Sequence, residues 1–171
     1  MQIFAVVSAP LSSAASARAD ACNLRGSWVA STAETTRYVQ AINPTTTEIR
    51  VTSGALSATF ADGRLTVGSI GLKLKGRKGR ATIKQEIDIE AVAPYRVAGS
   101  RLALGRGTYK LIYISNVIKT SSGVTVNANL PNVNTPTPPS TVAYSCTPST
   151  LRLHVAAGAS GVTLTLRRDR G

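Results

Sequence analysis

Histidine and cysteine are scarce in this chain of 171 residues, which contains one His and two Cys residues. A structural zinc site requires about four Cys or His ligands at short spacing, and the sequence has no Cys-x-x-Cys pair. His154 has no nucleophile or orienting acid in a local motif, as a catalytic triad would require. We therefore expect no metal, no cofactor and no catalytic residue, and we interpret the protein as a non-enzyme.

Acidic and aromatic residues are also few. Eight Asp and Glu residues stand against 20 Lys and Arg residues, so the formal net charge is +12. Such an excess either favours solubility or attracts an anionic partner, such as a membrane surface, an acidic polymer or nucleic acid. Aromatic residues make up 5% of the chain. None of them separates the clustered cations, so stacking on nucleic acid bases is not favoured.

The densest positive charge lies in residues 73–80, where no acidic residue occurs between Gly63 and Gln85. The glycines in this stretch would let backbone amides approach an anion. Two interpretations remain open: a patch that binds anionic lipid or polymer, and a solvated hairpin tip. The candidate anion-binding residues are Lys73, Lys75, Arg77, Lys78 and Arg80.

The apolar run at residues 3–11 is far too short to cross a bilayer as a helix. Small residues follow it at Ala15, Ala17 and Ala19, as in a secretion signal, although no Lys or Arg precedes the run. We predict a signal peptide over residues 1–21, with a disordered tail as the alternative. The mature protein would then be secreted or held in the cell envelope, where the conditions are oxidising.

Residues 22–171 show short apolar runs separated by turn residues, which predicts one all-β domain. The clearest strand is 81–91, in which Ile83, Gln85, Ile87 and Ile89 face one way and charged residues face the other. Asp62-Gly63 is typical of a hairpin turn. Residues 33–42 suit a short helix or an irregular lid, which we expect to cover the apolar outer face of strand 108–118. The Pro-rich segment 130–140 can form only an exposed loop or an edge segment.

An antiparallel meander of this kind either closes into a barrel or packs as a β-sandwich. The motif Gly26-Ser27-Trp28 on the first strand resembles the Gly-x-Trp signature of the lipocalin-like (calycin) barrels, including small secreted bacterial proteins with a lipocalin-like domain. In that family an Arg near the end of the last strand lies across the Trp and seals one end of the barrel. The resemblance implies this role for Arg168, which shares its face with Leu164 and Leu166.

Closure of the barrel would pair residues 24–29 with residues 162–168 and remove both bare edges of the sheet. A closed barrel also places early and late segments side by side, which predicts a disulfide between Cys22 and Cys146. Lipidation of Cys22 is the alternative.

The leading hypothesis for function follows mainly from the family resemblance: a small apolar or amphipathic ligand binds inside the barrel. An internal cavity would favour this carrier. A filled core with salt-sensitive binding would favour the alternative, a basic adaptor that docks on anionic lipid or polymer through residues 73–80. The residues expected to line the ligand cavity are Phe60, Ile83, Gln85, Ile87, Leu111 and Tyr113.

Overall fold

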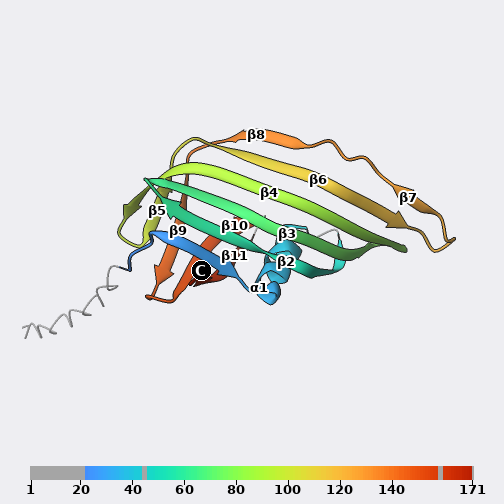
Figure 1. Ribbon diagram of the computed structural model, residues 1–171, viewed down its shortest axis with the longest axis horizontal. Coiled ribbons are helices and arrows are strands. Elements are labelled where there is room, and N and C mark those ends of the chain that lie inside the picture. The colour runs from blue at the N-terminus through green and yellow to red at the C-terminus, as the bar shows by residue number, and fades with distance from the viewer. Residues whose placement is uncertain (1–21, 44–45, 158–159, 171) are drawn as a thin grey trace, which may run out of the picture.

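The computed structural model describes residues 22–43, 46–157 and 160–170. The predicted signal peptide lies outside these residues. The described chain forms one short helix and a single antiparallel sheet (Figure 1). The elements are β1 (Gly26–Ala30), α1 (Thr32–Ile42), β2 (Thr47–Ala61), β3 (Arg64–Lys78), β4 (Ala81–Ala98), β5 (Arg101–Leu104), β6 (Gly107–Lys119), β7 (Thr125–Asn127), β8 (Val133–Thr137), β9 (Ser140–Cys146), β10 (Thr150–Ala157) and β11 (Ser160–Arg168).

Eight strands close into a barrel in the order β3-β2-β1-β11-β10-β9-β5-β4, and β4 pairs with β3 to complete the circle. The first and last strands meet with Trp28 opposite Arg168 and Ala30 opposite Leu166. The predicted all-β barrel and its closing strand pair are therefore confirmed, and the β-sandwich alternative is wrong.

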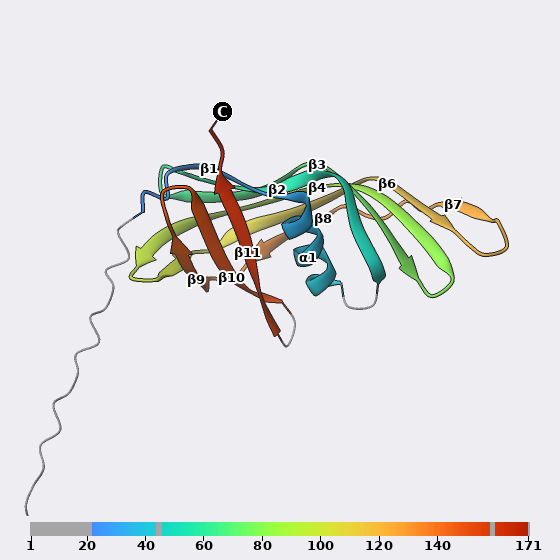
Figure 2. The ribbon, with the colours of Figure 1, turned by 90° about the horizontal axis from the view of Figure 1, so that it is seen from below.

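The sheet branches along β4, the longest strand. Its last four residues pair with β5 inside the barrel, whereas residues 82–92 pair with β6. Strand β6 in turn pairs with β7 and β8, which form no part of the barrel. Figures 1 and 2 show the result as a long curved extension of the sheet. We call it the arm, and it comprises residues 47–53, 72–78 and 81–92 together with β6, β7 and β8.

Glycine makes the branch possible at the β5–β6 connection. A Cβ atom on Gly107 would lie 2.2 Å from the carbonyl oxygen of Val92, and one on Gly105 would lie 2.8 Å from the Pro94 ring. Any other residue would force β6 away from β4. Pro94 stands where the partner of β4 changes, and it lacks the N–H that a continuous ladder would use.

Side chains fill the closed barrel. Trp28, Phe60, Leu102, Leu151 and Leu166 each have an exposed fraction below 2%. The indole N–H of Trp28 donates to the carbonyl of Leu24 at 2.9 Å, which satisfies its only polar group. Phe60 meets Tyr95 edge to face with ring centroids 5.1 Å apart.

Arg168 seals one end of this core. Its guanidinium carbon lies 4.2 Å from the centroid of the Trp28 ring. The same guanidinium donates to the backbone carbonyls of Asn23, Arg25 and Pro148. The planar guanidinium thus ties the segment before β1 to the β9–β10 turn, and its face covers the indole.

The predicted disulfide between Cys22 and Cys146 is confirmed, with 6.0 Å between the Cα atoms. It joins the segment before β1 to the end of β9, two regions that the closed barrel brings together. A disulfide is consistent with a protein outside the cytoplasm. Within the described residues, no helix has the length and hydropathy needed to cross a membrane.

Helix α1 begins at the N-cap Ser31, whose hydroxyl accepts from the Glu34 amide at 3.2 Å. It lies on the same side of the sheet as β9, β10 and β11 (Figure 2), which we call the concave face. The expectation that this helix covers the outer face of β6 is wrong. Ile112 and Ile114 on that strand remain 42% and 53% exposed.

The Pro-rich segment behaves as an edge, as its composition predicts. Strand β8 pairs only with β6, and Pro136 lies opposite Thr108. The predicted turn at Asp62-Gly63 also forms, with φ angles of 50° and 70°.

Candidate functional site

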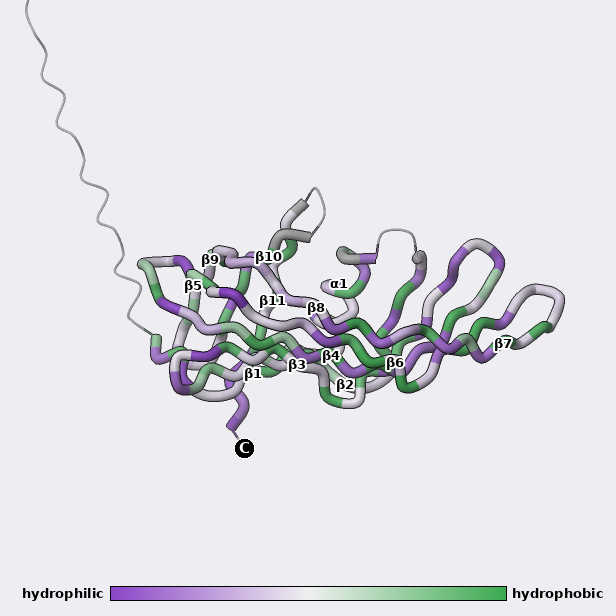
Figure 3. Tube along the Cα trace, turned by 90° about the horizontal axis from the view of Figure 1, so that it is seen from above, coloured by the Kyte–Doolittle hydropathy of each residue, from purple (hydrophilic) through white to green (hydrophobic). Residues whose placement is uncertain are grey.

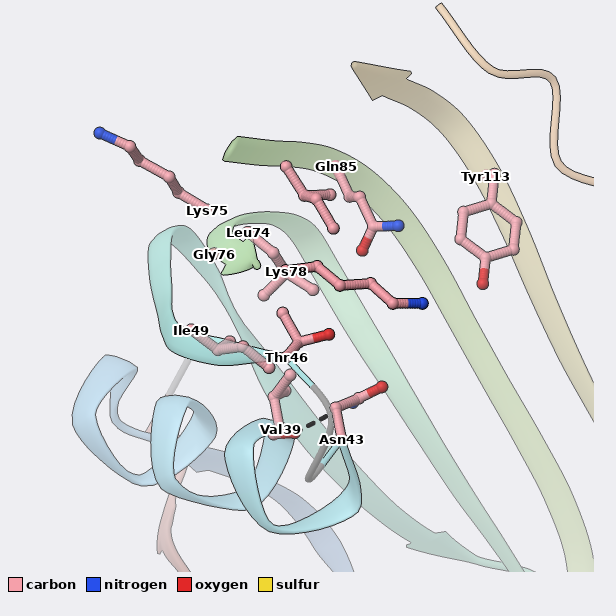
Figure 4. Close-up of a pocket in the computed structure, with 11 residues that line it drawn as sticks. Val39, Asn43, Thr46, Ile49, Leu74, Lys75, Gly76, Lys78, Gln85 and Tyr113 are labelled. Atoms are coloured by element: carbon pink, nitrogen blue, oxygen red, sulfur yellow. Dashed lines mark hydrogen bonds between the residues drawn. The ribbon is translucent and has the colours of Figure 1, made fainter. Parts of the chain in front are cut away.

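A pocket of about 270 Å³ lies where the arm meets the C-terminal end of α1 (Figure 4). Its apolar wall comes from four different elements or their ends. Its polar rim is formed by amide, hydroxyl, ammonium and phenol groups. The lining residues are Val39, Asn43, Thr46, Ile49, Leu74, Lys75, Gly76, Lys78, Ile83, Gln85 and Tyr113.

Strand alternation decides which basic residues reach this pocket. Leu72 and Leu74 are buried on the concave face, so Gly76 and Lys78 point the same way. Figure 4 shows the Lys78 side chain running across the pocket, while Lys75 points away from it. Among the residues that the structure describes, no Asp or Glu lines the pocket, so Lys78 places a positive charge there without a neighbouring carboxylate.

Gly76 lets strand β3 lie close to the start of β2 at the pocket. A Cβ atom at this position would lie 3.0 Å from the Thr46 side chain and 3.3 Å from Ile49. Glycine therefore lets the backbone of β3 approach both residues. The apolar wall formed by Val39, Ile49 and Leu74 depends on this close approach.

One polar pair crosses the concave face of the arm. The Gln85 side chain donates to the Asn116 Oδ1 atom at 3.0 Å, and Asn116 is 6% exposed. These residues face each other on β4 and β6. Asn116 thus holds the Gln85 amide at the wall of the pocket, and a buried polar group remains satisfied.

Three tyrosines, one of which (Tyr113) lines the pocket, lie at the concave face. Burial raises the pKa of Tyr109, with a smaller contribution from Tyr113. Burial also raises the pKa of Tyr38 on α1, followed by the effect of Tyr109. The phenols of Tyr38 and Tyr109 therefore stay neutral well above physiological pH. Together with Tyr113 they form a surface of apolar rings with hydroxyl groups.

The structure divides the residues that the sequence placed in one ligand cavity. Phe60 is fully buried in the filled barrel, and Ile87 is 7% exposed within the core. Leu111 packs against the same core. Ile83, Gln85 and Tyr113 instead line the pocket on the arm. The pocket therefore lies outside the closed barrel, whereas the sequence predicts a cavity inside the barrel.

Sequence reasoning missed the pocket role of Lys78, which it assigned to the basic run, and the contribution of Asn43 from α1. The alternation of side chains along β3, counted from Leu74 to Lys78, could have shown that both residues lie on the same face of the sheet. The contribution of Asn43 depends on where the helix packs, which local sequence does not specify.

The basic run itself is the tip of the β3–β4 hairpin, with Arg80 in its turn. On the convex face, opposite α1, Lys73 pairs with Glu86 at 3.5 Å and Arg77 with Glu48 at 3.6 Å. The five predicted residues therefore do not form one patch. Lys78 faces the pocket, and Lys73, Lys75 and Arg77 face the other side of the sheet.

The described part of the chain contains no group of three His, Cys, Asp or Glu residues that could hold a metal ion. His154 is exposed, and its Nδ1 atom lies 2.8 Å from the Thr163 hydroxyl. No match was found among protein-family models, curated proteins or solved structures. The resemblance to lipocalin-like barrels therefore stays a prediction based on Gly26-Ser27-Trp28 and Arg168.

Proposed function

We propose that this protein binds a small amphipathic molecule with an anionic head group in the pocket between α1 and the arm. The observation that supports this most directly is the Lys78 side chain, which runs across a pocket whose lining, among the described residues, includes apolar side chains and no acid. The disulfide supports a site of action outside the cytoplasm, in the secreted fraction or the cell envelope. The proposal is binding without chemistry, in line with a lipocalin-like carrier.

The wall and the rim favour different parts of such a ligand. Val39, Ile49 and Leu74 offer apolar surface from which an alkyl segment would displace water. The ammonium of Lys78 would attract a carboxylate, sulfate or phosphate more strongly at this partly enclosed site than in bulk water. The amides of Asn43 and Gln85 can then donate to the oxygens of the head group.

The size of the pocket limits how much of the ligand it encloses. A volume of about 270 Å³ lies just below the usual range for small-molecule pockets, roughly 300–1,000 Å³. A head group and a short alkyl segment would fill it. A longer tail would continue along the open concave face past Tyr113 and Tyr109.

Three decyl probes test both halves of this proposal: decanoate, decanol and decyltrimethylammonium. We expect isothermal titration calorimetry to show decanoate binding most tightly and the cationic probe most weakly. Lys78→Met should weaken decanoate binding about tenfold or more, since a charge-assisted hydrogen bond contributes about 1.5–3 kcal/mol.

Lys84→Met is the matched control. It removes the same charge from the neighbouring strand β4, but Lys84 is exposed on the opposite face of the sheet and does not line the pocket. Its decanoate affinity should equal that of the wild type. Failure of all three probes to bind would overturn the proposed function. Equal affinities for decanoate and decanol would overturn the anionic head group alone.

A further inference from the structure

Three exposed cations stand in line across the convex face of the arm. Arg50 on β2 lies directly opposite Lys75 on β3, and Lys75 lies directly opposite Lys84 on β4. Residues directly opposite each other in an antiparallel sheet project from the same face, and neighbouring strands are about 4.8 Å apart. We call Arg50, Lys75 and Lys84 the cation row. Only Lys75 belongs to the basic run of the sequence.

The cation row does not contribute to folding through ion pairs. Lys73 and Arg77, on the same face of β3, have carboxylate partners. Among the described residues, no acid lies within ion-pair distance of Arg50, Lys75 or Lys84. Like charges directly opposite each other destabilise a sheet. The arm thus maintains three adjacent positive charges at a cost to its own stability.

A shallow hollow adjoins the row on the same face. It has a volume of about 400 Å³, and its lining includes Arg50, Lys75, Arg77 and Thr82. The guanidinium groups offer donors in a planar fork that matches sulfate or phosphate oxygens. The hollow also includes Glu48, whose charge Arg77 offsets at 3.6 Å.

From this arrangement we propose that the cation row is the docking site of a linear acidic polymer, bearing sulfate, phosphate or carboxylate groups, that crosses β2, β3 and β4. An anionic group held by Arg50, Lys75 and Lys84 would replace the repulsion between them with attraction. This site goes beyond the ligand pocket, because its side chains project from the opposite face of the sheet from Lys78, and Arg50 and Lys84 do not line that pocket.

The charges around the row favour a narrow polymer over a flat membrane. Glu86, Asp88 and Glu90 follow Lys84 on the same face of β4. Lys73 and Lys110 pair with Glu86 and Glu90, so Asp88 is the carboxylate of this group without an ion pair among the described residues. A bilayer broad enough to cover the arm would bring Asp88 against anionic lipid headgroups. A single chain that crosses the strands at the cation row avoids this residue.

The test compares binding of dextran sulfate by the full chain and by the triple variant Arg50→Ser, Lys75→Ser, Lys84→Ser. The control is Arg96→Ser, Arg101→Ser, Arg106→Ser, which removes three exposed cations elsewhere and lowers the net charge equally. Each contact with a flexible polyanion adds about −0.7 to the slope of log K against log salt. Three contacts predict a slope of about −2, or about a 20-fold loss of affinity between about 50 and about 200 mM salt.

The row variant should lose most of this binding and most of the slope, while the control keeps at least half of its affinity. Circular dichroism and thermal melting verify that both variants are folded. Equal losses in the two variants would show attraction by net charge alone and overturn the proposal. Row-dependent binding to phosphatidylglycerol vesicles without binding to dextran sulfate would also overturn it, in favour of a membrane. Unchanged polymer binding by the row variant would overturn it outright.

Discussion

The two ends of the long strands β2, β3 and β4 have the same backbone structure, but one end belongs to the closed barrel and the other to the arm. At the barrel end these strands bury Leu56, Phe60 and Leu65 in a filled core. At the arm end their concave face has Gln85 and Lys78 next to a pocket. Figure 3 shows hydrophobic and hydrophilic residues alternating along the strands of the arm. Both ends contribute to one apolar core, which includes Leu72 and Leu74 of the arm, whereas the pocket proposed to bind a ligand lies at the arm end.

The difference arises from what covers the strands. In the barrel, β1 and β11 curl the sheet over itself, and the Cys22–Cys146 disulfide and Arg168 hold the closure. In the arm, α1 packs on the concave face, and its main contacts are with β2, β11 and β1. Side chains beyond the reach of the helix are therefore left half-exposed, as Tyr113 is. The proposed binding surface is thus a part of the sheet that the helix covers incompletely.

Removal of the disulfide is the strongest test of this division. The double variant Cys22→Ser, Cys146→Ser opens a loop with a sequence separation of 124. We expect the free energy of unfolding to fall by roughly 3–5 kcal/mol, measured by urea denaturation. If the arm is independent of the closure, decanoate affinity should stay unchanged under conditions where the variant is folded. A loss of affinity in the folded variant would show that the two ends are coupled.

Arg168→Met is the next largest expected effect. It removes the cation over Trp28 and three hydrogen bonds to backbone carbonyls. We expect a loss of about 1–3 kcal/mol in the free energy of unfolding, since exposure of the site limits each contribution. Trp28 emission should shift to the red as water reaches the indole.

Arg167→Met serves as the control for this change, because Arg167 is the exposed neighbour on the opposite face of β11. Its free energy of unfolding should stay within about 0.5 kcal/mol of the wild type. Equal losses for the two variants would contradict a specific role of Arg168 in sealing the barrel.

The sequence was sufficient to predict the closed barrel but not the arm. Period-two alternation, the turn at Asp62-Gly63 and the positions of Cys22 and Cys146 are local or pairwise signals, and each predicted its element correctly. The branch is different in kind. It depends on a change of partner along one strand, at Pro94, and alternation looks the same on both sides of that residue. The ligand residues were therefore placed in a single barrel, and the pocket formed by α1 and the arm was missed.

The stability of the protein at alkaline pH tests whether the tyrosines at the concave face are buried. The pKa of Tyr38 lies above its ordinary value of 10.0, so the folded protein keeps this proton where the unfolded chain has lost it. The resulting stability is complete below about pH 10 and is lost as the pH rises through the folded pKa. We expect Tyr38→Phe to lose less stability than the wild type between about pH 8 and about pH 11.

Urea denaturation at a series of pH values measures this difference, with Tyr109→Phe and the double variant beside it. Burial also raises the pKa of Tyr109, so the double variant should have the flattest alkaline profile. Parallel profiles for wild type and all variants would show that these phenols are as accessible to water in the folded protein as in the unfolded chain. The tyrosines would then not belong to the covered part of the concave face.

The smallest expected effect concerns the convex face and has the opposite sign. Lys75→Thr removes the middle charge of the cation row and so relieves its repulsion with both Arg50 and Lys84. Threonine also suits an exposed strand position. We expect the free energy of unfolding to rise by a few tenths of a kcal/mol at low salt, because cross-strand pairs contribute roughly 0.2–1 kcal/mol. About 1 M salt should abolish most of the gain by screening the charges. Lys73→Thr on the same face is the control, since it removes the ion pair with Glu86 and should give no gain. A destabilised Lys75→Thr variant would mean that Lys75 supports the arm, and the cation row would then be part of the fold and no evidence for an acidic partner.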